Sequence, residues 1–102
     1  MKSIKEIEDK IKELKLERNV PSSEHDHGIY LEEKIYTLSD TLELFDRCMP
    51  RTHDLEEAVK CVELSVRYKI RDLRAQKEKI SELSQAVPLI RAKIDMFKWV
   101  LK

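Results

Sequence analysis

Four side chains that could hold a phosphate gather around one short break in the sequence. Arg47, Arg51, Thr52 and His53 surround Pro50, and the residues after them read as the start of a helix. Backbone N–H groups at a helix N-terminus, together with guanidinium groups, favour a bound anion. Four nearby carboxylates oppose that attraction: Asp46, Asp54, Glu56 and Glu57. On residue chemistry alone, a phosphate site and a merely charged turn both stay open.

The other candidates for chemistry are weaker. His25-Asp26-His27 carries two imidazoles at a spacing that fixes no third metal ligand, so we predict no metal site and no cofactor. Cys48 and His53 could approach each other across the turn, but no third residue is placed to orient them as a nucleophilic pair. Gly28 stands alone instead of within a glycine-rich phosphate loop. We therefore predict that the chain is not an enzyme.

Two long apolar runs at helical spacing flank this turn. The first run consists of Leu31, Ile35, Leu38, Leu42, Phe45 and Met49. The second consists of Leu55, Val59, Val62, Val66, Leu73, Ile80, Leu83, Val87, Ile90, Ile94, Phe97 and Leu101, with Lys69 and Gln76 in the same register. Two apolar seams joined by a tight turn predict an antiparallel helical hairpin of the coiled-coil type.

Local signals set the predicted helix boundaries. Ser3 followed by Glu6 is a capping-box pattern, which predicts a first helix over 3–18. Residues 19–28 contain Pro21 and Gly28 and are predicted to form a loop. A second helix is predicted over 29–48. Thr52 is the predicted cap of a third helix that starts at 53.

Pro88 lies inside the second apolar run and would ordinarily end a helix. The apolar spacing nevertheless keeps its phase from Leu83 and Val87 to Ile90 and Ile94. We therefore predict one long C-terminal helix over 53–101, kinked near Pro88, in preference to a separate fourth helix.

The composition indicates one all-α domain over 1–102. The chain has a single glycine, and 39% of its residues are charged. Twenty basic and twenty acidic residues leave no net charge, so attraction to nucleic acid polymers or to a membrane surface is not expected. No run approaches the roughly 18 apolar residues of a membrane span. A surplus apolar stripe through Tyr36, Leu44 and Leu64 predicts a homo-oligomeric helical bundle.

The two cysteines are predicted to be free thiols. In a hairpin that turns near Arg51, Cys48 would lie opposite residue 55 and Cys61 opposite residue 42, too far apart for a disulfide. Reduced thiols and the absence of an apolar signal region favour a cytoplasmic location.

The turn and its surroundings resemble a known family. Cys48-Met49-Pro50-Arg51-Thr52-His53-Asp54, followed by Ala58-Val59, Val62-Glu63, Ser65-Val66 and Tyr68, is similar to the helical hairpin of phage anti-CBASS and anti-Thoeris nucleotide sponges. His27-Gly28 and the stretch Tyr30 to Ile35 stand where that family has a His-Pro-Gly loop and a Tyr-containing helix. The resemblance covers about residues 25–73. It departs from the family at Tyr68, where a Trp is expected, and at Thr52-His53-Asp54, which replaces a Ser-Arg-Glu turn.

The resemblance implies a small homo-oligomer, from dimer to hexamer, that captures a cyclic nucleotide or cyclic ADP-ribose type signal without cleaving it. The implied phosphate-binding residues are Lys34, Arg51, Thr52 and His53, and the implied base-stacking residues are Tyr30 and Tyr68. If the chain is viral, it would act in the cytoplasm of the host cell. The alternative is a coiled-coil protein–protein interaction module, or small regulator, with no nucleotide ligand. Such a module needs the apolar seams but not the residues of the turn.

Overall fold

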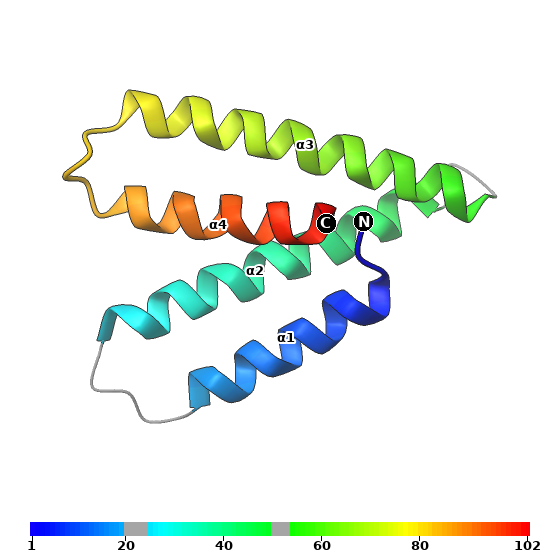
Figure 1. Cartoon of the computed structure of the whole chain (residues 1–102), viewed down its shortest axis with the longest axis horizontal. Helices are drawn as coiled ribbons and strands as arrows, with labels where there is room; N and C mark the ends of the chain where they lie inside the picture. Colours follow the sequence, from blue (N-terminus) through cyan, green and yellow to red (C-terminus); the bar gives the residue numbers. More distant parts are fainter. Residues whose placement is uncertain (20–24, 50–53) are drawn as a thin grey trace.

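The chain folds into four α-helices and, within the described residues, no strand (Figure 1). The computed structural model describes residues 1–19, 25–49 and 54–102, with the side chains of 25–27 excepted. The helices are α1 (Ile4–Asn19), α2 (His25–Cys48), α3 (Leu55–Lys79) and α4 (Ala86–Leu101). The predicted all-α class is confirmed.

Helix α2 is the central element, because it packs against α1, α3 and α4. Helix α4 also lies along α3, and the molecule is a flattened body of 47 × 34 × 19 Å. The two ends of the chain lie side by side (Figure 1), where the Lys2 N–H donates to the Val100 carbonyl at 2.7 Å. Lys2 and Lys10 also place their ammonium groups over the Trp99 ring, 5.2 and 5.8 Å from its centroid, which ties α1 to α4.

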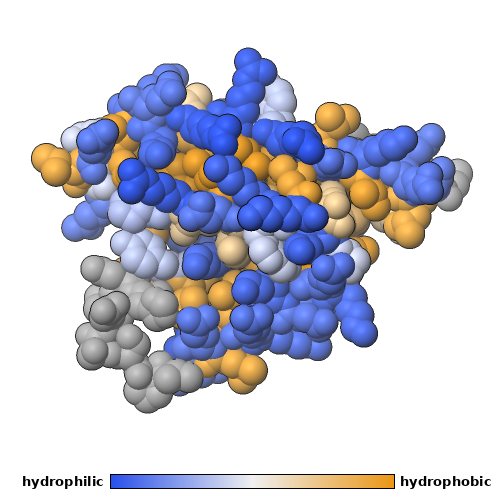
Figure 2. Space-filling view, in the orientation of Figure 1, coloured by the Kyte–Doolittle hydropathy of each residue, from blue (hydrophilic) through white to orange (hydrophobic). Residues whose placement is uncertain are grey.

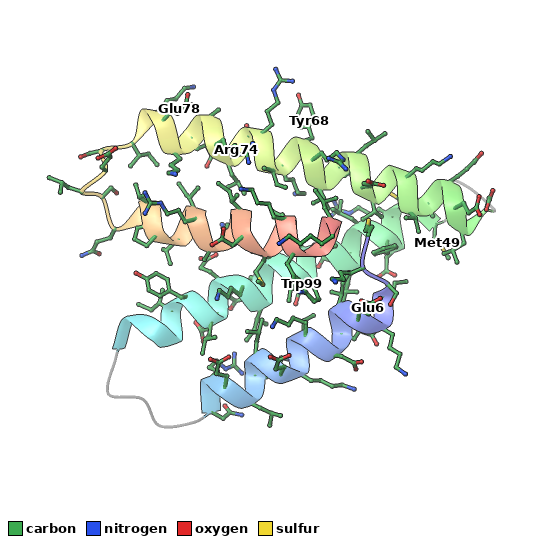
Figure 3. All side chains as sticks on the ribbon, in the orientation of Figure 1. Glu6, Met49, Tyr68, Arg74, Glu78 and Trp99 are labelled. Atoms are coloured by element: carbon green, nitrogen blue, oxygen red, sulfur yellow. A yellow bond between two sulfur atoms is a disulfide. The ribbon has the colours of Figure 1, made fainter. Side chains whose placement is uncertain are left out.

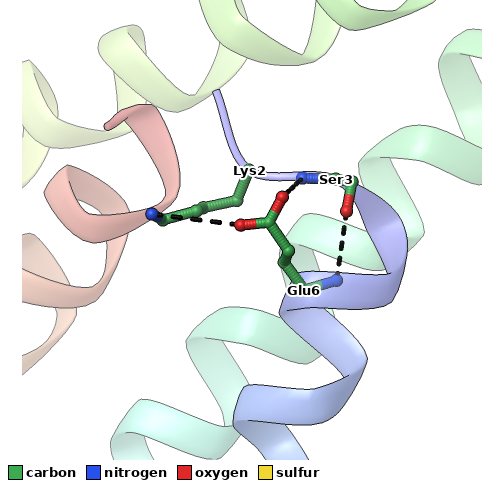
Figure 4. A network of polar contacts seen from close by, with 3 residues as sticks. All are labelled: Lys2, Ser3 and Glu6. Carbon is green, nitrogen blue, oxygen red and sulfur yellow. Dashed lines mark hydrogen bonds and ion pairs between the residues drawn. The ribbon is translucent and has the colours of Figure 1, made fainter.

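The predicted capping box at the start of α1 is confirmed. The Glu6 N–H donates to the Ser3 hydroxyl at 3.2 Å, and the Ser3 N–H donates back to the Glu6 carboxylate at 3.4 Å (Figure 4). The Lys2 ammonium lies 4.0 Å from the other Glu6 oxygen. These contacts pair two N–H groups that a helix end leaves without partners.

Two helix starts differ from the predictions. Helix α2 begins at His25, so the predicted loop over 19–28 is too long, and Gly28 lies inside the helix. A glycine costs a helix only about 1 kcal/mol relative to alanine, which tertiary packing overrides. Helix α3 begins at Leu55 instead of residue 53, because the Asp54 side chain caps it and accepts the Glu56 N–H at 3.0 Å. The predicted cap, Thr52, lies outside the described residues.

The predicted single helix over 53–101 is wrong. Helix α3 ends at Lys79, and residues 80–85 turn the chain so that α4 runs back beside α3 (Figure 1). Two serines stabilise this turn: the Ser81 hydroxyl accepts the Leu83 N–H at 3.3 Å, and the Ser84 hydroxyl accepts the Ala86 N–H at 3.2 Å. Such local bonds compete with the helical bonds of the backbone. Leu83 is 95% exposed, so the apolar register is broken within the turn.

Pro88 lies in the first turn of α4. The backbone N–H groups of a first turn have no partner within the helix, so a proline there removes no helical hydrogen bond. We expect Pro88→Ala to lower the free energy of unfolding by about 0.4–1 kcal/mol, because it frees the unfolded chain. A urea titration of both proteins measures this difference. A kinked continuous helix predicts the opposite sign, so a stabilised variant would contradict the observed turn.

The core consists of one apolar stripe from each helix. Its largest fully buried apolar side chains are Ile7, Leu38, Val62, Val66 and Val100. Helix α3 buries Ala58, Val62, Val66 and Ile70, at a spacing of four residues, and Lys69 and Gln76 are exposed outside this row. Lys69 and Gln76 are therefore not part of a buried seam, contrary to the predicted register.

Cys48 and Cys61 form a disulfide, which corrects the prediction of free thiols. Their Cα atoms are 6.1 Å apart, within the usual range for such a bond. The prediction assumed equal lengths of helix on the two sides of the turn. In the structure, Cys61 lies six residues inside α3 and still stands level with the last residue of α2, so the two helices are staggered.

Candidate ligand-binding site

The site residues predicted from the sequence fall into three groups. Arg51, Thr52 and His53 lie outside the described residues. Tyr30 and Lys34 lie one turn apart near the start of α2. Tyr68 lies in the middle of α3, where 73% of its side chain is exposed.

Tyr30 and Lys34 share one groove between α2 and α4. Helix α4 contributes Pro88, Arg91 and Asp95 to this groove, which has a volume of about 260 Å³. A second hollow of about 190 Å³ adjoins it and shares Tyr30 and Pro88. Tyr30 is half-buried, so one part of the phenol ring packs on the protein and another faces the groove. We call the larger of the two, which Lys34 and Arg91 also line, the Tyr30 groove.

The charges in the Tyr30 groove favour an anion. Two cations, Lys34 and Arg91, face one carboxylate, Asp95. Neither cation has a carboxylate oxygen within 4.0 Å among the described residues, so both are available to an external anion. The nearby pair of Lys93 and Glu33, 3.5 Å apart, joins α4 to α2 without involving Lys34 or Arg91.

Tyr68 belongs to a different surface. Its side chain points outward from α3, on the side away from α4 (Figure 3). Leu64, one turn earlier on α3, is 69% exposed as well. The structure of the single chain therefore does not bring Tyr68 into the Tyr30 groove.

Tyr30 is also distant from Cys48, the last residue of α2. Tyr30 precedes Cys48 by eighteen residues of continuous helix, which corresponds to about 27 Å. One ligand of ordinary nucleotide size therefore cannot contact both Tyr30 and Cys48 on one chain.

Comparison with known proteins adds no evidence about the residues of the site. No family model, curated protein or solved structure matches the chain. Within the described ranges, no group of three or more His, Cys, Asp or Glu side chains is placed to hold a metal ion. In the same ranges, no helix combines the length and apolarity needed to cross a membrane.

Sequence reasoning missed Arg91 and Pro88 as site residues. A continuous helix over 53–101 would carry both of them away from the start of α2. The turn at 80–85 instead folds α4 back, and its first residues then meet Tyr30. The available signal was Ser81 and Ser84 shortly before a proline, which is typical of a loop followed by a helix start.

Proposed function

We propose that this chain is a non-enzymatic binding protein that sequesters a cyclic nucleotide or cyclic ADP-ribose type signal. The observation that carries the proposal is the Tyr30 groove. There an aromatic ring stands beside two cations, Lys34 and Arg91, that have no carboxylate partner among the described residues. Bases stack on aromatic rings, and phosphates bind Lys and Arg side chains. The resemblance of residues 25–73 to phage nucleotide sponges supports the same ligand class.

The proposed action is capture without chemistry. The two cysteines are joined in a disulfide, so neither is a free nucleophile. Lys34 and Arg91 would neutralise phosphate charge, and Tyr30 would cover one face of a base. The ligand would then be recovered unchanged when the protein is denatured.

The size of the groove bears on how the ligand is held. Ligand pockets usually enclose about 300–1,000 Å³, and the Tyr30 groove offers about 260 Å³. One chain would therefore cover one nucleotide unit, and a second subunit of an oligomer, from dimer to hexamer, would cover the rest. In such an oligomer, Arg51, Thr52, His53 or Tyr68 of another subunit can complete the site.

The test is a thermal-shift and calorimetric screen of the wild-type protein against cyclic dinucleotides, cyclic trinucleotides and cyclic ADP-ribose isomers. A ligand at 100 times its dissociation constant adds about 2.7 kcal/mol of stability. We expect Arg91→Ala and Tyr30→Ala each to weaken binding at least tenfold, since each removes one of the ligand contacts.

Tyr68→Ala removes an aromatic ring of the same kind outside the groove of its own chain. Unchanged binding in this variant assigns base stacking to Tyr30 alone, whereas weakened binding shows that Tyr68 of another subunit completes the site. Binding that is lost in Arg51→Ala but unchanged in Arg91→Ala and Tyr30→Ala would move the site to the turn. No heat with any of these ligands, together with co-purification of a helical partner, would favour the protein-interaction module.

A further inference from the structure

A second, basic surface lies between α3 and α4. Two adjoining cavities of about 490 and 530 Å³ share Arg74 and Glu78 and together form what we call the basic trough. Six cations line it: Arg67, Arg71, Arg74, Lys77, Arg91 and Lys98. Only two lining residues, Glu78 and Glu82, are acidic. Figure 3 shows Arg74 and Glu78 on α3 at this surface.

The floor of the basic trough is apolar. Ile70 and Val87 line it and are buried, and Ile80 and Leu101 line it and are half-buried. Apolar side chains show between the hydrophilic ones along α3 and α4 in the space-filling view (Figure 2). An apolar floor with a cationic rim is the arrangement that receives one face of an amphipathic, acidic helix.

Most cations of the trough have no carboxylate partner among the described residues. Arg67 donates to the Glu63 carboxylate at 3.0 Å. Arg71, Arg74 and Lys98 have no carboxylate oxygen within 4.0 Å in the part of the chain that the structure describes. Arg67 and Glu78 are eleven residues apart on α3, which spreads the charges over roughly 16 Å. Cations spread along a line suit an extended partner better than a single phosphate.

The outer face of α2 is complementary to this trough. Its stripe consists of Ile29, Glu32, Tyr36, Asp40 and Glu43, which recur every three or four residues and are all exposed. Three of the five are carboxylates and none is a cation. We call it the acidic stripe. It covers fifteen residues, from Ile29 to Glu43, which rise by about 21 Å along the helix, so it spans the trough. Glu32 lies 3.9 Å from Arg18 of α1, whereas Asp40 and Glu43 have no ion pair among the described residues.

We propose that the basic trough of one copy of this chain binds the acidic stripe of α2 from a second copy. Carboxylates of the stripe would meet Arg71, Arg74 and Lys98, and Tyr36 would rest on the apolar floor. The chain has no net charge, so copies do not repel one another at long range. Stripe and trough share no residue, so the contact is head-to-tail. A pair of copies then keeps one free stripe on the first copy and one free trough on the second. This inference goes beyond the proposed function and needs no ligand.

Sedimentation velocity of the ligand-free protein tests the proposal. The sedimentation coefficient of the wild type should rise between about 5 and 500 µM at low salt, and this rise should shrink in 0.5 M salt because the Debye length falls to a few ångströms. Arg71→Glu/Arg74→Glu cancels the positive charge of the trough. Tyr36→Ala/Glu43→Lys removes the aromatic ring of the stripe and replaces one of its carboxylates by a cation. Each double variant alone should associate at least tenfold more weakly.

A mixture of the two variants gives the decisive result. The trough variant keeps its acidic stripe, and the stripe variant keeps its trough, so one productive contact remains between them. We expect a one-to-one heterodimer that does not grow further with concentration. Circular dichroism confirms that each variant is folded before mixing, and Arg67→Ala/Lys98→Ala serves as a milder trough variant if the charge reversal unfolds the chain.

Three outcomes would overturn the proposal. One is a wild type that stays monomeric at 500 µM in low salt. Another is self-association that the variants do not change, which would place the interface elsewhere. The third is a mixture that stays monomeric although wild-type association is lost in both variants. These variants leave Tyr30 and Lys34 intact, so nucleotide binding can be measured in them as a separate experiment from self-association.

Discussion

Reduction of the Cys48–Cys61 disulfide is expected to lower the melting temperature by about 12–24 °C. The bond joins residues thirteen positions apart and ties the end of α2 to α3. A crosslink over a loop of this size stabilises by about 3 kcal/mol, chiefly by restricting the unfolded chain. In a domain of about 100 residues, each kcal/mol shifts the melting temperature by about 4–8 °C.

Thermal melts by circular dichroism with and without dithiothreitol measure this effect. Cys61→Ser is the matched variant, because Cys61 is only half-buried whereas Cys48 is 4% exposed. The variant should melt like the reduced wild type and should not respond to reductant. Equal melting temperatures of the wild type in both conditions would show that the bond does not form in solution.

The disulfide also bears on where the proposed function can operate. Disulfides persist in oxidising compartments and are rare in a reducing cytoplasm. A sponge for a cytoplasmic signal must therefore fold with its two thiols reduced. The melt in dithiothreitol tests this requirement directly, because a reduced protein that is unfolded at growth temperature would contradict a cytoplasmic role.

Leu38→Ala is expected to lower the free energy of unfolding by about 2–5 kcal/mol. Leu38 has no exposed surface and lies on α2, which packs against the three other helices. Its truncation removes buried apolar area and leaves a cavity that three neighbouring helices cannot fill by moving together. Against a total stability of about 5–15 kcal/mol, this loss is large.

A urea titration of wild type and variant at one temperature measures the difference. Leu64→Ala is the control for the same chemical change, because Leu64 is 69% exposed. It should stay within about 0.5 kcal/mol of the wild type. Similar losses in both variants would mean that α3 buries its outer face, for instance in an oligomer, while a small loss at Leu38 would contradict the central place of α2.

The sequence alone determined the local structure. Helical periodicity predicted the buried positions Leu31, Ile35 and Leu38, and the capping pattern of Ser3 and Glu6 predicted the start of α1. These features depend on contacts between residues three or four apart on one helix, and that spacing can be read without knowing any partner.

Only the tertiary structure decided which helices pack together and how far they are staggered along their axes. The apolar spacing in the sequence continues through residues 80–85, although Leu83 is exposed in the structure, so periodicity could not separate α3 from α4. The stagger that joins Cys48 to Cys61 depends on how the two helices pack, and the sequence pattern leaves this open. Tyr30 and Arg91 line one groove because the turn at 80–85 folds α4 back along α2. Contacts between residues distant in the chain are set by turn length and by the packing of whole helix faces.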